Sequence, residues 1–255
     1  AYSNNGTTWT SGINISNSAK VIDYPSFSLF ANNNSLYLVY VENSTTKRNL
    51  TLKTCDDGCT NASNWVNKTT IYQGGAERPE LKKDSNGKLH LVFENYTATS
   101  SYGTILYTQC SANCNNASNW LSPIRIDNNV AGYALQPALN IDSNNNLHAM
   151  WMDKINNTQW DILYATCPAT SNCTDTSNWS ILNVTNRDSG DDDTVFVIDS
   201  NNVIHVTYDN NEGEVEYVNC SSSCTNRSKW SSPFNVSNSR PIKPGHSTIA
   251  IDSAN

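Results

Sequence analysis

The stretch DSNNNLHAMW at Asp142–Trp151 is the clearest copy of an element that recurs along the chain. It reads ANNNSLYLVY at Ala31–Tyr40, DSNGKLHLVF at Asp84–Phe93 and DSNNVIHVTY at Asp199–Tyr208, and a further copy opens at Ile249–Asn255. Asn and Gly tolerate the positive φ angles of tight turns. A short run of apolar residues that ends on an aromatic is typical of a strand. Each copy therefore predicts a tight turn between two β-strands.

A pair of cysteines and then a tryptophan follow each copy of this element. The second cysteine precedes the tryptophan by six residues in every copy, at Cys59 and Trp65, Cys114 and Trp120, Cys173 and Trp179, and Cys224 and Trp230. Counting from Trp9, successive copies of this tryptophan are 56, 55, 59 and 51 residues apart. Four short strands per repeat, a periodic aromatic and no helical apolar stripe predict an all-β propeller of four-stranded blades.

The repeats predict a single β-propeller domain over residues 1–255, with four complete blades and parts of a fifth. The blades are expected at about 20–72, 73–130, 131–188 and 189–240, and the partial fifth blade at 1–19 and 241–255. The Trp9 strand and the Ser247–Ile251 strand would be its outer and inner strands. Because unpaired strand edges are templates for strand addition, we expect neighbouring repeats or a second copy of the chain to complete this blade.

The eight cysteines are expected to form four disulfides, each within one blade: Cys55–Cys59, Cys110–Cys114, Cys167–Cys173 and Cys220–Cys224. The alternative is a zinc site, but pairs about 55 residues apart do not easily form a four-ligand cluster. Disulfides indicate an oxidising compartment and therefore an extracellular or cell-surface protein. The density of Asn-X-Ser/Thr sequences agrees. The predicted glycosylation sites are Asn5, Asn14, Asn33, Asn43, Asn49, Asn61, Asn67, Asn95, Asn116, Asn156, Asn183, Asn226 and Asn235.

Composition argues against two classes of partner. Only 15% of the residues are charged, the net charge is −7, and no basic run occurs, which argues against nucleic acid. No apolar stretch approaches the ~18 residues that a membrane span needs, so membrane insertion is not expected.

The segment SNNGTTW at Ser3–Trp9 is one residue short of the Asp-box, Ser-x-Asp-x-Gly-x-x-Trp, and has Asn in the place of Asp. With the turn-then-strand element, it resembles the sialidase-type (BNR, or Asp-box) propeller repeat. In the other copies a disulfide loop would take the place of the Asp-box. The resemblance implies the propeller fold. Sialidases of this type bind the substrate carboxylate with three arginines and use a Tyr–Glu pair and an Asp, and no residue here can be assigned to these roles.

The loops that lead into each first strand hold the candidate site residues, because loops on a rigid scaffold usually carry function. Arg78, Tyr102, Tyr133, Trp160 and His246 form the predicted ligand-binding set, as a sugar-stacking and hydrogen-bonding surface. Asp188, Asp191, Asp192 and Asp193 form an oxygen-rich loop of the kind that calcium prefers, and no other cofactor is expected. The repeated His90, His148 and His205 are expected to be structural, packed between blades.

Three functions remain open from the sequence. The unfinished blade favours a structural or assembly module of a surface fibre or matrix. The aromatic and polar loops allow a carbohydrate-binding lectin or adhesin. Only the acidic loops support a sialidase-like glycoside hydrolase, so we expect no enzymatic activity.

Overall fold

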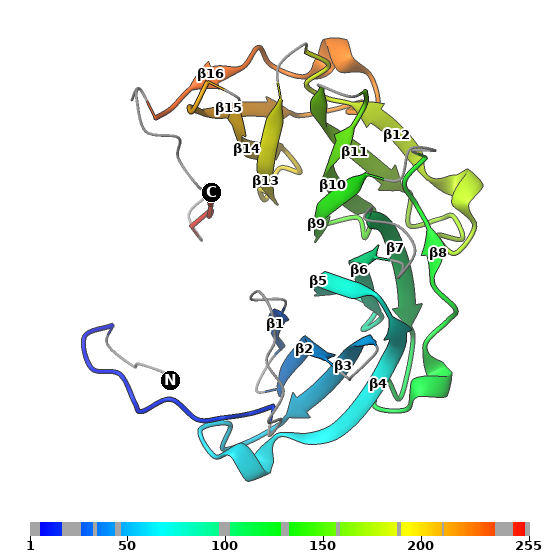
Figure 1. Ribbon diagram of the computed structural model, residues 1–255, viewed down its shortest axis with the longest axis vertical. Coiled ribbons are helices and arrows are strands. Elements are labelled where there is room, and N and C mark those ends of the chain that lie inside the picture. The colour runs from blue at the N-terminus through cyan, green and yellow to red at the C-terminus, as the bar shows by residue number, and fades with distance from the viewer. Residues whose placement is uncertain are drawn as a thin grey trace.

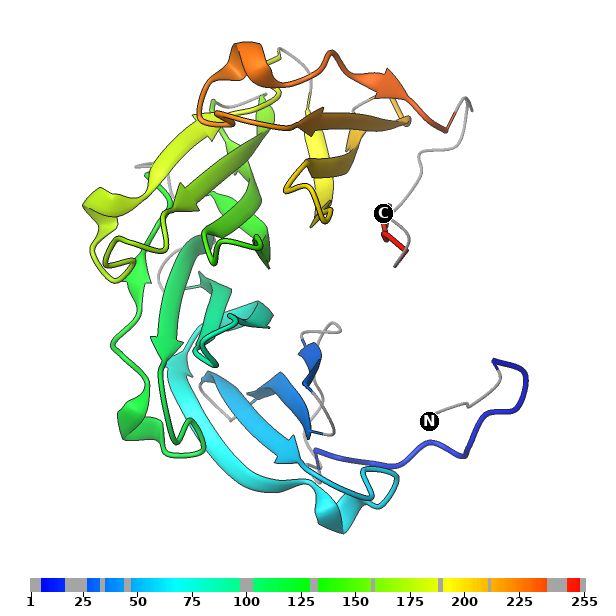
Figure 2. The same ribbon diagram turned by 180° about the vertical axis from the view of Figure 1, so that it is seen from behind.

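The computed structural model describes residues 6–16, 27–32, 35–43, 47–96, 103–128, 133–156, 159–187, 190–210, 212–237 and 247–252. Its strands form four antiparallel four-stranded sheets, which stand around a common centre as blades (Figures 1 and 2). The first strand of each blade lies nearest the centre and the fourth lies at the rim. The predicted all-β propeller with four complete blades is confirmed.

The four blades follow one another along the chain, and each uses four consecutive strands. Blade 1 holds β1 (Phe27–Asn32), β2 (Ser35–Asn43), β3 (Arg48–Cys55) and β4 (Val66–Gly74). Blade 2 holds β5 (Ala76–Lys83), β6 (Leu89–Tyr96), β7 (Gly103–Cys110) and β8 (Ile124–Arg125). Blade 3 holds β9 (Ala134–Ile141), β10 (Leu147–Lys154), β11 (Trp160–Cys167) and β12 (Ser180–Asn183). Blade 4 holds β13 (Asp191–Ile198), β14 (Ile204–Asn210), β15 (Val215–Cys220) and β16 (Phe234–Asn235).

The ring is open on one side, and residues 6–16 and 247–252 lie there, where a fifth blade would complete it (Figures 1 and 2). Neither segment contains a strand, and Trp9 is 64% exposed. The strand expected at Ser247–Ile251 is therefore not formed: Ser247 contacts Thr207 of β14 through its side chain, but the segment pairs its backbone with none of the described strands. Completion of this blade by a neighbouring repeat or chain stays a prediction.

Antiparallel pairing sorts the connections of the blades onto two faces. The turn between the first two strands and the cysteine loop after the third strand lie on one face, which we call the cystine face. The loop between the second and third strands and the link to the next blade lie on the other, which we call the connection face. No helix in the described ranges has the length and apolar character needed to cross a membrane.

The turns on the cystine face explain the repeated Asp-Ser-Asn sequence. The Asp142 carboxylate accepts hydrogen bonds from the backbone N–H groups of Asn144 (2.9 Å) and Asn146 (2.8 Å), while Asn145 takes the left-handed backbone at φ 63°. The turns at Asp84 and Asp199 repeat this arrangement, with Gly87 and Asn202 in the left-handed position. The turn predicted from this sequence is confirmed.

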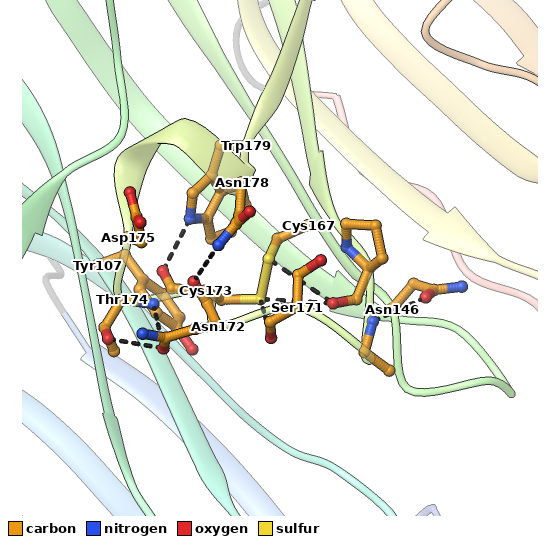
Figure 3. Close-up of a disulfide and its surroundings, with 12 residues drawn as sticks. Tyr107, Asn146, Cys167, Ser171, Asn172, Cys173, Thr174, Asp175, Asn178 and Trp179 are labelled. Carbon is orange, nitrogen blue, oxygen red and sulfur yellow. Dashed lines mark hydrogen bonds between the residues drawn. A yellow bond between two sulfur atoms is a disulfide. The ribbon is translucent and has the colours of Figure 1, made fainter.

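All four predicted disulfides are present, with Cα–Cα distances of 5.7, 5.7, 5.9 and 5.8 Å. After each one, a short 3₁₀ turn brings the tryptophan back over the cystine, at η1 (Ala62–Asn64), η2 (Ala117–Asn119), η3 (Thr176–Asn178) and η4 (Arg227–Lys229). In blade 3 the Trp179 indole donates a hydrogen bond to the Cys173 carbonyl at 2.9 Å (Figure 3). The other three blades form the same bond, which accounts for the constant six-residue offset.

These tryptophans also join neighbouring blades. Trp179 of blade 3 packs edge-on against Tyr107 of blade 2, with ring centroids 5.3 Å apart (Figure 3), and Trp230 of blade 4 packs against Tyr164 of blade 3 at 5.6 Å. In the described ranges, three apolar clusters each combine residues of two successive blades. Apolar contact between neighbouring blades therefore holds the ring together.

The repeated histidines have a structural place, although their polar contacts lie within their own blades. Nδ1 of His90 lies 2.7 Å from the Tyr107 hydroxyl oxygen, and Nε2 of His90 lies 3.4 Å from a carboxylate oxygen of Asp84. His148 and His205 make the same two contacts with the Tyr and Asp of their blades. His90 and His148 are buried and His205 is half-buried.

Acid is expected to destabilise the fold through His90 and His148, because burial lowers the pKa of both side chains. Burial lowers the pKa of His90 to about 4, although Asp84 acts in the opposite direction. The unfolded chain binds a proton near pH 6.5 and the folded chain does not, so stability falls as the pH drops from about 6.5 to about 4. We expect His90 to contribute a loss of about 2 kcal/mol between pH 7 and pH 5. Urea unfolding of the wild type and of His90→Gln checks this, and equal pH slopes for both would contradict it.

The structure separates the predicted glycosylation sites by exposure. Asn14, Asn61, Asn116, Asn156 and Asn226 are exposed, and Asn43, Asn49, Asn183 and Asn235 are half-buried. Asn5, Asn33 and the side chain of Asn67 lie outside the described residues. Asn95 is corrected: its side chain is buried and accepts hydrogen bonds from the Tyr72 hydroxyl (3.0 Å) and the Gly75 N–H (3.2 Å), which leaves no room for a glycan.

Candidate functional site

The innermost strands of blades 2, 3 and 4 begin on the connection face with the same irregular backbone. The third residue of each strand, Arg78, Gln136 and Asp193, has a positive φ of 44°, 56° and 46°. A shift in strand register accompanies each one. Residues other than glycine rarely adopt this backbone, and such strain gathers at functional sites. The centre of the connection face is therefore the first candidate for a functional site.

Blade 2 supplies a buried cluster of charges at this place. The fully buried Glu94 carboxylate accepts hydrogen bonds from the Arg78 guanidinium (2.8 Å) and from the Gln136 backbone N–H of blade 3 (3.0 Å). Glu77, which lies opposite Glu94 in the strand register, forms an ion pair with Arg48 of blade 1. Two carboxylates in register repel each other, so the two arginines are needed to hold them together.

A second buried network lies between blades 3 and 4. The Arg187 guanidinium is 2.6 Å from the Asp191 carboxylate and 2.8 Å from that of Glu216, and the Tyr208 hydroxyl donates to Glu216 at 2.7 Å. Burial raises the pKa of Asp191 to about 6, the charge of Asp161 acts in the same direction, and Arg187 acts against both. A buried carboxyl that titrates near neutral pH, on the face that carries the loops, is typical of a functional site.

Asp161 extends this network within blade 3. Its carboxylate accepts hydrogen bonds from the side-chain amides of Asn183 (2.5 Å) and Gln159 (2.9 Å) and from the Arg187 backbone N–H (3.2 Å). Asp161 and Asp191 are both fully buried. Buried carboxylates are costly unless donors surround them, so this network fixes the position of the strand that starts at Asp191.

The structure brings together two of the five predicted ligand-binding residues. The rings of Tyr133 and Trp160 meet edge to face with centroids 5.9 Å apart, and the Lys154 ammonium lies 4.4 Å from the Tyr133 ring centroid and 5.8 Å from that of Trp160. Both aromatic side chains are half-buried. Arg78 instead bonds Glu94. Tyr102 and His246 lie outside the described residues.

The predicted calcium loop does not assemble in the part of the chain that the structure describes. Within those ranges no group of three or more His, Cys, Asp and Glu side chains could hold a metal ion. Asp191 and Asp192 are consecutive strand residues in register with Asn210 and Asp209, and neighbouring side chains of a strand point to opposite faces. Asp188, the fourth predicted ligand, lies outside the described residues.

Sequence reasoning missed Arg187 and its partners. Arg187 is four residues before Asp191, but Glu216 and Tyr208 come from other strands, and only the fold brings the four together. The acidic residues near the ends of the second strands were the one sequence feature that pointed to buried carboxylates on the connection face. Glu94 and Asp209 occupy the same place in blades 2 and 4, opposite Glu77 and Asp192.

Comparison with known proteins supports the fold of this chain but assigns it to no family. No protein-family model and no curated protein sequence matches the chain. A solved protein of unknown function from Dyadobacter fermentans has a TM-score of 0.61 at 10% identity, covering 82% of this chain and 67% of its own. An α-L-arabinofuranosidase from Lactobacillus brevis has a TM-score of 0.53 at 12% identity, covering 81% and 72%. A protein named as a putative exo-β-1,3-galactanase from Bifidobacterium bifidum has a TM-score of 0.51 at 12% identity. The match covers 82% of this chain and 70% of the galactanase chain.

These similarities correct two predictions. A structural or assembly role and the absence of enzymatic activity were predicted, and both predictions are wrong, because solved propellers that match most of the chain are named as glycosidases. An unfinished blade does not by itself indicate an assembly role, because one fold hosts many functions and the site decides among them. The comparisons support a β-propeller and not the sialidase-type repeat in particular.

Proposed function

We propose that this protein is a carbohydrate-active enzyme that hydrolyses glycosidic bonds at the centre of the connection face. The acidic starts of the innermost strands carry the proposal. Glu77 in blade 2 and Asp192 in blade 4 are the second residues of equivalent strands, and each stands in register with a further acid, Glu94 and Asp209. Glycoside hydrolysis needs a pair of carboxyl groups across the scissile bond.

The proposed substrate is a neutral glycan, with arabinofuranosyl and galactosyl polymers as the first choices because of the named enzymes that share the fold. Charge supports this choice. A sialidase needs free arginines for the substrate carboxylate, whereas Arg78 and Arg187 are already paired with buried carboxylates. A net charge of −7 also disfavours acidic sugars.

Roles follow from the surroundings of each carboxylate. Glu77 and Asp192 are the proposed catalytic pair because they hold equivalent places at the starts of β5 and β13. Glu77 is buried and paired with Arg48, so Arg48 would have to move before Glu77 could contact the sugar. Asp191, held by Arg187, is the proposed positioning residue that fixes the start of β13. Tyr133 and Trp160 form the proposed sugar-binding subsite, because the faces of aromatic rings pack against the C–H groups of sugars.

An extracellular location is part of the proposal. The four disulfides support it, because such bonds persist in oxidising compartments and are rare in the cytosol. Extracellular enzymes meet polysaccharides directly, so the location and the proposed substrate agree.

Release of reducing sugars tests the activity. The wild type is expected to release sugars from arabinan, galactan or an aryl glycoside of the same sugars. Glu77→Gln and Asp192→Asn are each expected to lower kcat at least about a hundredfold, because each removes a carboxyl group from the reaction. Asp56→Asn, at an exposed site on the cystine face, is the matched control and should keep full activity.

Two outcomes of this assay would be informative in different ways. A folded wild-type protein that releases no sugar from any of these substrates would contradict the proposed activity. An active wild type with unchanged activity in both carboxylate variants would contradict the residue assignment alone.

A further inference from the structure

A cleft of about 260 Å³ lies on the cystine face between blades 1 and 2, away from the proposed catalytic centre. Blade 1 lines it with Tyr37, Leu52 and Thr54. Blade 2 lines it with Leu89 and with the cystine turn around Cys114. Leu52 and Leu89 are buried and form its apolar part, whereas hydroxyl groups and the backbone of the turn form its polar part.

The other three blades show what fills this place. Each of these blades carries a tyrosine three residues before its first cysteine: Tyr107 in blade 2, Tyr164 in blade 3 and Tyr217 in blade 4. The hydroxyl of each tyrosine is 2.7 Å from Nδ1 of the blade's histidine. In blades 2 and 4 it also bonds Gln109 (2.9 Å) or Asn219 (3.1 Å) on the same strand.

Blade 1 departs from this arrangement at two of the positions. Leu52 stands where the other blades have tyrosine, and Tyr37 stands where they have histidine. Thr54 takes the place of Gln109, and the pairs Tyr37–Thr54 and His90–Gln109 hold the same register. The cleft is thus bounded by the residues that surround a phenol ring elsewhere in the propeller, while the ring itself is absent from blade 1.

We propose that this cleft binds a small phenol, a planar aromatic ring with a hydroxyl group, in the place of the absent tyrosine side chain. The ring would lie against Leu52 and Leu89, and its hydroxyl would bond Tyr37 and Thr54. Apolar space beside packed side chains gains dispersion energy when a ring of matching shape enters it. The site is independent of the proposed enzymatic function, since it uses other residues on the opposite face.

Titration with p-cresol, which is the tyrosine side chain as a free molecule, tests the site by ligand-observed NMR. The wild type is expected to bind it, and Leu52→Tyr, which restores the residue of the other blades, is expected to bind at least about tenfold more weakly. Leu52→Phe fills the same space without a hydroxyl and should also block binding. Ile155→Tyr adds a tyrosine at an exposed site on the connection face and should bind p-cresol as the wild type does.

Three results would overturn the proposal. They are no binding of p-cresol by the folded wild type, equal binding by the wild type and both Leu52 variants, and binding of L-arabinose or D-galactose in this cleft in preference to p-cresol. Because sugar hydrolysis is measured separately, failure of this site leaves the proposed function untouched.

Discussion

Replacing Trp179 with alanine is expected to lower the free energy of unfolding by about 4 kcal/mol. Trp179 is 7% exposed, donates its indole N–H to Cys173 and packs against Tyr107 of the preceding blade. The change removes an aromatic from a close-packed contact between blades, opens a cavity and leaves the Cys173 carbonyl without its donor. Guanidinium unfolding followed by far-ultraviolet circular dichroism measures the loss.

Trp9→Ala is the matched control. Trp9 has the same repeat position but is 64% exposed, so its replacement should change the free energy of unfolding by less than about 0.5 kcal/mol. Equal losses in the two variants would show that the contact between blades at Trp179 does not stabilise the ring.

Arg187→Met is expected to destabilise the protein by about 3 kcal/mol at pH 7. Arg187 is the cation between Asp191 and Glu216, whose side chains are 0% and 11% exposed. Without it, two buried carboxylates lose their counter-charge. Lys68→Met is the control, because Lys68 is 49% exposed and pairs with Glu42 at the surface, where such pairs contribute about 0–1 kcal/mol.

The loss at Arg187 should depend on pH in a defined direction. The pKa of Asp191 is about 6 with Arg187 present, and removing the cation raises it further. Asp191 is then protonated and neutral at pH 5, so Arg187→Met should be less destabilising at pH 5 than at pH 7. Asp191→Asn in the Arg187→Met background should recover part of the loss at pH 7. An Arg187→Met loss that is the same at both pH values, with no recovery, would contradict the network.

The fold could be predicted from sequence because its signals are local and repeated. The Asp142 turn needs only residues within four positions of each other, and the six-residue step from Cys173 to Trp179 is set by a single hydrogen bond. Such features survive in a sequence whatever the surrounding structure. The prediction of a strand at Ser247–Ile251 failed because a strand needs a neighbouring strand for its hydrogen bonds, and a local sequence pattern does not provide one.

The candidate site could be predicted only in part, because its contacts cross strands and blades. Tyr133 directly precedes β9 and Trp160 begins β11, and the two meet at Lys154 of the intervening β10, an arrangement that the sequence allowed but did not require. Arg187 forms an ion pair with Glu216 of blade 4, a contact that the sequence does not indicate. The predicted assembly role rested on the repeat, whereas the proposed function rests on carboxylates from different blades, which the repeat does not place.

The most direct test of the proposed function is a crystal structure of Asp192→Asn bound to the oligosaccharide that the hydrolysis assay selects. We expect a sugar on the connection face, within hydrogen-bonding distance of Glu77 and of residue 192, with an adjoining sugar ring against Tyr133 or Trp160. A sugar bound only on the cystine face or at the rim of the blades, with the centre of the connection face holding solvent alone, would contradict it.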